Sequence, residues 1–276
     1  MTSSLNVKDM KLYSEAESLL NDVDARGFTA DQPLEVGVVS QFDQLHYHGV
    51  ESVQQAIDDL GISSSDDILE VGAGWGGPSR YIAAKAGAKL TALELQQDFS
   101  TVGAEITRRC GLSHLVHHQT ADFLDVDYGD RRFDHVVSWL ALYHIPRRAE
   151  YTAKIRELLR PGGTLFIEDL TTGPDHDKAD QALLKRELFS SSMISHSDYV
   201  QSLNDAGFEI IYADDMTADW HSFTSTRLQL FDQNREAYVA IHGEALFADK
   251  RHFYAKIVEY FTSSAIGGIR VAARRV

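Results

Sequence analysis

The segment Ile68–Leu95, ILEVGAGWGGPSRYIAAKAGAKLTALEL, decides the fold that the sequence predicts. An apolar strand pattern runs into a glycine-rich turn, a helical pattern follows at once, and a second apolar run ends at Glu94. Glycines in such a turn let backbone N–H groups approach a ligand that side chains would otherwise keep away. The structural alternative is a tight junction between strand and helix, so the glycines alone do not define a ligand.

Two classes of ligand use a strand, turn and helix of this kind. Gly72, Gly74 and Gly77 match the G-x-G-x-x-G pattern, in which a dinucleotide pyrophosphate lies at the helix N-terminus. S-adenosylmethionine instead passes its amino-acid part and ribose over the turn. In both cases Glu94 is placed to accept hydrogen bonds from two ribose hydroxyls. Glu70 favours the second class, because an acid inside the turn repels a pyrophosphate but can bind an α-ammonium group.

From about residue 67 onward, short β-type runs alternate with helical patterns. This alternation predicts an α/β fold with a Rossmann-like, doubly wound parallel sheet and crossover helices on both faces. Ligands of such sheets bind beyond the carboxyl ends of the strands. We expect seven strands, the fifth of which follows a turn at Pro161-Gly162-Gly163, and they begin in ILEVGA, KLTALEL, LVHHQTA, HVVSWLAL, TLFIEDL, FEIIYADD and IGGIRVAAR.

Helical patterns flank this core on both sides. We expect an N-terminal helical lid over residues 1–60, helical from about residue 7, and a cofactor-binding core over 61–172. Residues 173–276 form a substrate cap together with the last strands of the sheet. About fifty residues separate the last two strands, which is too many for a hairpin turn. Helices inserted there, before the last strand, would cover the ligand side of the sheet.

Composition limits the partners. The chain has 276 residues, 43% of them hydrophobic, and a formal net charge of −15. The acid excess disfavours nucleic acid and anionic membranes and favours a small neutral or cationic ligand. The sequence lacks a run of eighteen apolar residues and a signal-peptide pattern, so we expect a soluble cytoplasmic protein. The single cysteine, Cys110, cannot form an internal disulfide and is expected to pack against a helix.

Five motifs in order over residues 60–172 resemble the class I S-adenosylmethionine-dependent methyltransferases: EVGAGWGG, the acid Glu94, ADF at 121–123, the strand FDHVVSWLALYHI, and LLRPGG. The resemblance implies S-adenosylmethionine as the cofactor, with Glu94 on the ribose, Asp122 and Phe123 on the adenine, and Trp139 or Leu140 facing the methyl donor. The full set of implied cofactor contacts is Glu70, Gly72, Ala73, Gly74, Gly76, Glu94, Leu95, Asp122, Phe123, Trp139 and Leu140.

The flanking segments are similar to those of small-molecule N-methyltransferases of the phosphoethanolamine, glycine, sarcosine and dimethylglycine type. In the phosphoethanolamine enzymes an acid that faces the substrate amine stands where this chain has Leu140. Their basic and tyrosyl phosphate-binding residues lie near Phe189, Ser190 and Ser191 of this sequence. Both departures argue against a phosphobase substrate. His144 aligns with the histidine that assists catalysis in that group.

Methyl transfer is an in-line displacement, so the protein mainly holds nucleophile and methyl group in alignment. An amine or hydroxyl must also lose a proton, and His144 is the candidate general base. Tyr47 is the candidate residue that closes over the methyl donor. Tyr143 and Trp220, together with Trp139, are candidates for an aromatic wall around a cationic amine. Each of these side chains is also compatible with a purely packed position.

No metal site is expected. His46 and His48 have no metal-ligand partner at a recognisable spacing and are interpreted as surface or lid residues, and His117 and His118 point to opposite faces of one strand. The sequence therefore predicts methyl transfer from S-adenosylmethionine to a small molecule, with an amine nitrogen as the first choice and O-, S- or C-methylation as alternatives. An NAD-dependent oxidoreductase and a non-catalytic cofactor-binding module are the more distant alternatives, and the oligomeric state is not predicted.

Overall fold

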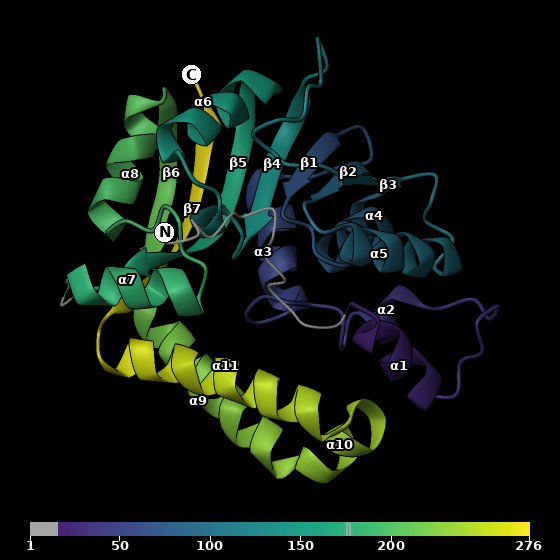
Figure 1. The fold of residues 1–276 in the computed structure, drawn as a ribbon. Coiled ribbons are helices and arrows are strands. Elements are labelled where there is room, and N and C mark those ends of the chain that lie inside the picture. The colour runs from purple at the N-terminus through teal and green to yellow at the C-terminus, as the bar shows by residue number, and fades with distance from the viewer. Residues whose placement is uncertain (1–15, 175, 177) are drawn as a thin grey trace.

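A seven-stranded sheet with the strand order β3-β2-β1-β4-β5-β7-β6 forms the centre of the molecule (Figure 1). The structure is a computed structural model that describes residues 16–174, 176 and 178–276. It confirms the Rossmann-like α/β sheet that the alternating pattern predicts. The strands are β1 (Asp67–Val71), β2 (Lys89–Glu94), β3 (Val116–Thr120), β4 (Phe133–Trp139), β5 (Leu159–Thr172), β6 (Phe208–Asp215) and β7 (Ile266–Arg275).

The strands run parallel, as the alternating pattern predicts, with the exception of β7. The strands β3, β2, β1, β4 and β5 pair in parallel, whereas β7 runs antiparallel to both β5 and β6. The chain leaves β6 at the carboxyl edge of the sheet, forms helices over that edge and returns from the same side, so β7 must run the opposite way. The neighbouring strands β1 and β4 mark the point where the strand order reverses, which is where such sheets bind ligands.

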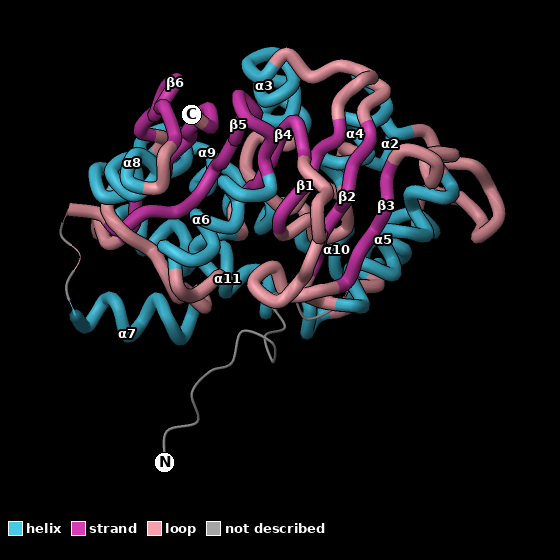
Figure 2. Tube along the Cα trace, turned by 90° about the horizontal axis from the view of Figure 1, so that it is seen from above, coloured by secondary structure: helices cyan, strands magenta, loops and turns pink. Residues whose placement is uncertain are grey.

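Helices cover both faces of the sheet (Figure 2). The helices α3 (Val50–Leu60) and α4 (Gly77–Ala86) pack on one face, and α6 (Arg148–Leu158) and α8 (His196–Asp205) pack on the other. The helix α5 (Gln97–Arg109) packs on β3 and β2. Ile68 and Leu69 point to opposite faces of the sheet, and both are fully buried. Ile68 packs in the cluster with α3 and α4, and Leu69 packs in the cluster with α6 and α8. Burial on both faces explains why the strands read as continuous apolar runs.

The predicted turn at Pro161-Gly162-Gly163 is wrong as a boundary, because these residues lie inside β5. Leu159 pairs with Phe133, and Thr164 pairs with His135, so β5 carries extra residues between the two pairs and forms a bulge. Gly162 has a φ of 78°, a conformation that glycine adopts without steric cost. The glycines therefore bend the strand within the sheet and do not precede it.

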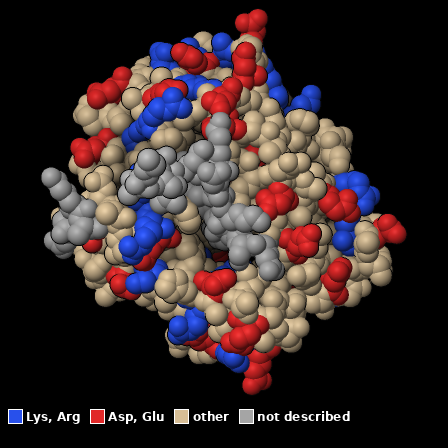
Figure 3. All heavy atoms as spheres, viewed as in Figure 1, with Lys and Arg blue, Asp and Glu red and all other residues tan. Residues whose placement is uncertain are grey.

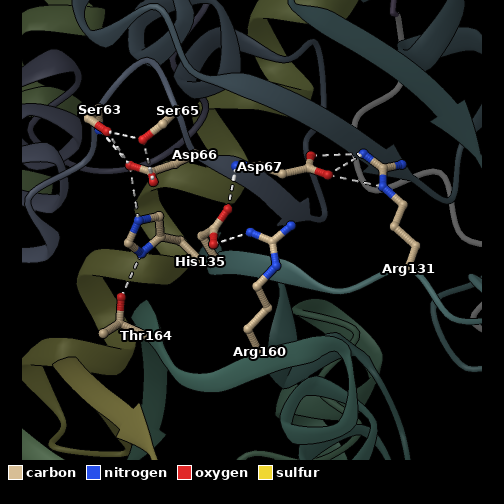
Figure 4. A network of polar contacts seen from close by, with 9 residues as sticks. Ser63, Ser65, Asp66, Asp67, Arg131, His135, Arg160 and Thr164 are labelled. Carbon is tan, nitrogen blue, oxygen red and sulfur yellow. Dashed lines mark hydrogen bonds and ion pairs between the residues drawn. The ribbon is translucent and has the colours of Figure 1, made fainter.

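A polar network holds the amino ends of β1 and β4 (Figure 4). The backbone N–H of Asp67 donates to Asp134 Oδ2 at 2.8 Å, and the Asp67 carboxylate pairs with Arg131 at 2.8 Å. Asp134 also pairs with Arg160, and His135 lies in the same network. This cluster lies at the edge of the sheet opposite the glycine turn, so it fixes the strands without taking part in the site.

The N-terminal segment is less helical than predicted. Its helices are α1 (Ser18–Ala25), α2 (Val36–Val39) and α3, and loops separate them. Gly27 and Gly49 adopt φ values of 84° and 51°, which interrupt the helical patterns on either side. The first residues of the predicted opening helix lie outside the described part of the chain. The indole N–H of Trp75 donates to the carbonyl of Ala16 at 2.9 Å, so this segment packs directly on the glycine turn.

Helices inserted between β6 and β7 confirm the predicted cap: α9 (Thr217–Gln233), α10 (Arg235–His242) and α11 (Glu244–Thr262). A further helix, α7 (Lys178–Glu187), follows β5. Figure 1 shows α9 and α11 side by side below the core, with α10 reaching toward α1. His242 Nε2 lies 3.4 Å from Asp22 Oδ1, which joins cap and N-terminal segment. The two segments thus meet over the carboxyl edge of the sheet.

The surface carries charges of both signs. Figure 3 shows acidic side chains spread over one face, with basic side chains in small groups among them. None of the helices in the described ranges is long and apolar enough to cross a membrane.

Candidate functional site

The glycine turn after β1 requires glycine for conformation and for space. Gly72, Gly74 and Gly76 have φ values of 77°, 53° and 73°. A Cβ atom at Gly72 would lie 2.2 Å from the Cβ of Ala141, and one at Gly74 would lie 2.8 Å from Leu45 Cδ1. The backbone N–H groups of residues 72 and 73 both donate to the carbonyl at the end of β2 at 2.9 Å. The turn is therefore a tightly held strip of backbone between β2 and the end of β4.

Glu94 ends β2 beside this turn. Its Oε2 accepts the backbone N–H of Gly74 at 2.8 Å, and its Oε1 accepts that of Gln96 at 2.8 Å. Burial raises the pKa of Glu94, while these N–H groups act in the opposite direction. A carboxylate offers about four acceptor positions, so further hydrogen bonds from a vicinal diol are available. Leu95 is half-buried and follows directly. The observed geometry fits the predicted ribose contact.

Glu70 lies beneath the turn and faces α4. Its Oε2 accepts hydrogen bonds from the backbone N–H of Ser79 at 3.1 Å and from the Ser79 hydroxyl. The side chain is 2% exposed, and burial raises its pKa to about 8, against the effect of the Ser79 hydrogen bonds. The visible role of Glu70 is thus to hold the first turn of α4. Its contact with an α-ammonium group remains a prediction.

The predicted adenine-binding pair follows β3. Asp122 Oδ1 accepts the backbone N–H of Leu124 at 2.9 Å, which fixes a turn at the end of the strand. Phe123 is buried and packs in the cluster that also holds Val71 and Leu93. The ends of β1, β2 and β3 therefore meet at Phe123. This position suits an apolar wall for a flat ring, and the specific adenine contacts remain predictions.

The end of β4 is tied to both the lid and the sheet. The indole N–H of Trp139 donates to Ser52 Oγ at 2.8 Å, and its ring lies 5.6 Å from that of His46. Leu140 has a φ of 53°, an unfavourable backbone conformation for a side chain of this size. Its N–H donates to the β5 carbonyl of Glu168 at 2.7 Å. This strained residue directs Ala141 against the glycine turn.

His144 ends a short 3-10 helix, η2 (Leu142–His144), that follows β4. Its Nδ1 lies 3.2 Å from the carbonyl of Phe189. Because a carbonyl can only accept, Nδ1 carries the proton and Nε2 is left as the acceptor. Burial lowers the pKa of His144 to about 4, against the effect of the Phe189 hydrogen bond. A lowered pKa together with Nε2 as the acceptor is the combination that a general base needs.

Predicted residues from three segments come together in one apolar cluster. The Tyr47 ring contacts the Trp220 ring edge-to-face at 5.0 Å between centroids. Trp139 belongs to a different cluster, so the structure does not bring it together with Tyr143 and Trp220. Tyr47 lies beside Trp220 instead, and an aromatic wall around an amine remains a prediction. Burial raises the pKa of Tyr47 to about 12, against the effect of the nearby Arg227. We call this set the acceptor-side cluster: Tyr47, Leu140, Tyr143, Leu170, Leu184, Trp220 and Phe223.

A buried polar network below His144 was missed by sequence reasoning. Asp169 on β5 accepts the Tyr199 hydroxyl at 3.0 Å and the backbone N–H of Tyr143 at 3.2 Å. Arg148 lies 3.9 Å from the same carboxylate. Burial raises the pKa of Asp169 to about 6, although Arg148 lowers it. The network positions η2, and the acid within the apolar run TLFIEDL was the available signal.

The lid histidines have distinct roles. The surface alternative is wrong for His46, which is buried and lies 2.9 Å from Gln44 Oε1 through Nε2. Burial lowers the pKa of His46 to about 4. His48 Nε2 lies 2.6 Å from Asp219 Oδ2 at the start of α9. His48 therefore connects the lid to the cap, and His46 packs against Trp139.

The sheet order, the glycine turn after β1 and the acid at the end of β2 define a class I S-adenosylmethionine-dependent methyltransferase, with S-adenosylmethionine as its cofactor. The chain belongs to the family described as mycolic acid cyclopropane synthetase, whose model matches residues 41–269. This membership decides against the dinucleotide-binding alternative.

Curated relatives include N- and O-methyltransferases. The chain is 34% identical over 151 residues to sarcosine/dimethylglycine N-methyltransferase of Halorhodospira halochloris, with 54% of each chain covered. It is 31% identical over 159 residues to the O-methyltransferase cnsE of Penicillium expansum, with 57% of each covered. The matching segment thus spans little more than half the length of these relatives.

A solved structure shows the same fold. Phosphoethanolamine N-methyltransferase 2 of Haemonchus contortus, in complex with S-adenosyl-L-methionine, superposes with a TM-score of 0.81 at 15% identity. The similarity covers 99% of this chain and 60% of the other. At this identity the likeness concerns the fold alone.

Proposed function

We propose that the protein transfers the methyl group of S-adenosylmethionine to a nitrogen of a small amine. The observation that carries this proposal is the buried His144 imidazole beyond the carboxyl end of β4, whose Nδ1 lies 3.2 Å from the Phe189 carbonyl so that Nε2 is left as the acceptor. Ala141 lies three residues before His144 and contacts the glycine turn at Gly72. His144 is therefore close in the chain to the predicted cofactor site. The N-methyltransferase among the relatives supports the same reaction class.

Each group has a defined task in this reaction. Bound S-adenosylmethionine supplies an electrophilic methyl group on a sulfonium. The glycine turn and Glu94 hold the donor, while the acceptor-side cluster excludes water and orients the amine. His144 Nε2 accepts a proton from the nucleophile. A pKa near 4 makes this a weak base, and a negatively charged group on the substrate would increase its basicity.

The test is a comparison of two buried histidines at opposite edges of the sheet. Labelled methyl transfer to a panel of amines, amino acids, thiols and phenols, with product masses, identifies the preferred acceptor. We expect His144→Asn to lower turnover of that acceptor by about 10²-fold or more while S-adenosylhomocysteine affinity changes little. His135→Gln, at the amino edge of the sheet, should keep normal turnover. Unchanged turnover in His144→Asn would refute the base assignment.

O-methylation is the second candidate. The identity with an O-methyltransferase supports it, and His144 can serve a hydroxyl nucleophile in the same way. A panel in which phenols or alcohols are methylated and amines are not would replace the nitrogen assignment.

A further inference from the structure

An arginine lies on the apolar face of α9. Trp220, Phe223, Thr224 and Arg227 are spaced three, four and seven residues from the first, so they share one face of the helix. Trp220 and Thr224 are fully buried, and Phe223 belongs to the acceptor-side cluster. This face packs toward Tyr47. A permanent positive charge therefore lies at the border of the region predicted to hold the acceptor.

Aromatic rings surround the Arg227 guanidinium. Its Cζ lies 5.0 Å from the Tyr47 ring centroid and 5.7 Å from that of Phe223. The ring of Tyr254 on α11 lies closest, at 4.2 Å. Such contacts attract a cation and fix its orientation, but they do not neutralise it.

Arg227 has no counterion in the described part of the chain. The neighbouring cap arginines are paired, Arg235 with Glu244 at 2.6 Å and Arg251 with Asp232 at 2.7 Å. Arg227 forms no such ion pair with any described residue, and its Nε is buried without a hydrogen-bond partner among them. A partly desolvated cation without a counterion is costly. A ligand that brings negative charge would remove that cost.

We infer that Arg227 binds an oxyanionic group, a carboxylate or a phosphate, of the methyl acceptor. The inference rests on the proposed function, since it assigns the substrate class of the same site. The planar guanidinium can donate two parallel hydrogen bonds to such a group, with Tyr47 beside it. The net charge of −15 favours a neutral or cationic ligand for the molecule as a whole, yet the local charge here is positive.

Two matched pairs of probes test this inference. Calorimetry on the S-adenosylhomocysteine complex compares sarcosine with sarcosinamide, and phosphoethanolamine with ethanolamine. We expect at least one acidic member to bind about tenfold or more tightly than its neutral partner. Arg227→Gln should abolish that preference and Arg227→Lys should keep part of it. Arg251→Gln, which removes an exposed, paired cap arginine, should leave it unchanged.

The outcomes separate this inference from the proposed function. Equal binding of acid and neutral partner in both pairs, no binding of either acid, or a preference that survives Arg227→Gln each overturns the role of Arg227. The pair that shows the preference identifies carboxylate or phosphate as the recognised group. Failure of the folded protein to bind S-adenosylhomocysteine would instead overturn the proposed function. The wild-type comparison alone tests the anion preference, so it does not depend on the stability of any variant.

Discussion

At the scale of single residues, Gly72 shows how one position couples two strands. Its φ of 77° turns the chain after β1, and its missing side chain leaves room for Ala141 after β4. The glycine-rich pattern predicts the turn from the sequence alone. The contact with Ala141 is a tertiary contact between distant parts of the chain, so the local sequence pattern could not predict it.

Two glycines with a positive φ, one in open space and one in contact with Ala141, allow the cost of backbone strain to be separated from the cost of steric overlap. Gly61 at the end of α3 has a φ of 65° and nothing within 4 Å of an added Cβ. Gly61→Ala should cost about 1 kcal/mol from backbone strain alone. Gly72→Ala should cost about 2 kcal/mol more and should weaken cofactor binding, because its Cβ would overlap Ala141. Urea unfolding measures both, and equal losses would show that the overlap relaxes freely.

Glu70 makes stability depend on pH. Its pKa is about 8 in the folded protein, because of burial, against an ordinary value of 4.5. Between these values the native state binds more protons than the unfolded state, so the contribution of Glu70 to stability falls as pH rises. Glu70→Gln removes this dependence. Relative to wild type, the variant should gain on the order of 3 kcal/mol between pH 5 and pH 9 in urea unfolding. Parallel stability curves for the two proteins would contradict the pKa assignment.

At the scale of elements, the sequence patterns predicted which segments form buried strands, but they did not predict the direction in which each strand runs. Ile68–Val71 and the other apolar runs predicted strands because both faces of the sheet are covered. The direction of β7 depends on where the cap returns the chain, which no pattern in IGGIRVAAR encodes. The glycines at 162 and 163 suggested a turn, since glycine is equally suited to a turn and to a bulge.

Site residues whose position depends only on neighbouring sequence were predicted, whereas residues that depend on contacts between distant segments were not. Glu94 is the last residue of its strand, and its place at that strand end, next to the glycine turn, could be expected because the apolar run stops there. Asp169 and Arg227 were missed because their partners come from other elements, Tyr199 on α8 in the first case and Tyr47 in the second. In each case the signal was a charged residue within an apolar run or helix face.

Two buried tryptophans test the contact between elements. Trp75 Nε1 donates to the Ala16 carbonyl at 2.9 Å, and its ring stacks on Phe99 at 5.1 Å. Trp220 Nε1 is buried and has no partner among the described residues. Both tryptophans lose similar volume on change to Phe, so the hydrogen bond decides the difference. Trp75→Phe should destabilise the protein by about 1 kcal/mol more than Trp220→Phe in thermal unfolding. The reverse order would argue against the lid contact.

At the scale of the whole molecule, lid and cap close over the carboxyl edge of the sheet. His48 with Asp219 and His242 with Asp22 join segments that lie far apart in the sequence. The chain as a whole carries a net charge of −15, whereas Arg227, next to the Tyr47 ring, is a local positive charge. Net charge is thus a guide to solution behaviour and a poor guide to the ligand.

Buried neutral histidines should make the fold sensitive to acid. Burial lowers the pKa of His46 and His144 to about 4 and that of His118 to about 3, from an ordinary value of 6.5. Between these values the unfolded state binds more protons, so stability falls as pH drops from 6.5 toward 4. Each histidine contributes up to about 3 kcal/mol over this window. His118→Gln should flatten the dependence of unfolding free energy on pH, and an unchanged slope would place that histidine in contact with solvent.

S-adenosylmethionine is expected to bind between the turn after β1 and the carboxylate of Glu94 at the end of β2. Titration calorimetry with S-adenosylhomocysteine tests it most directly, in wild type and in Glu94→Gln. We expect one-to-one binding by wild type and a loss of about tenfold or more in Glu94→Gln, because a charged acceptor is replaced by a neutral one. A folded wild-type protein that releases no heat with this ligand, or a Glu94→Gln variant with full affinity, would contradict it.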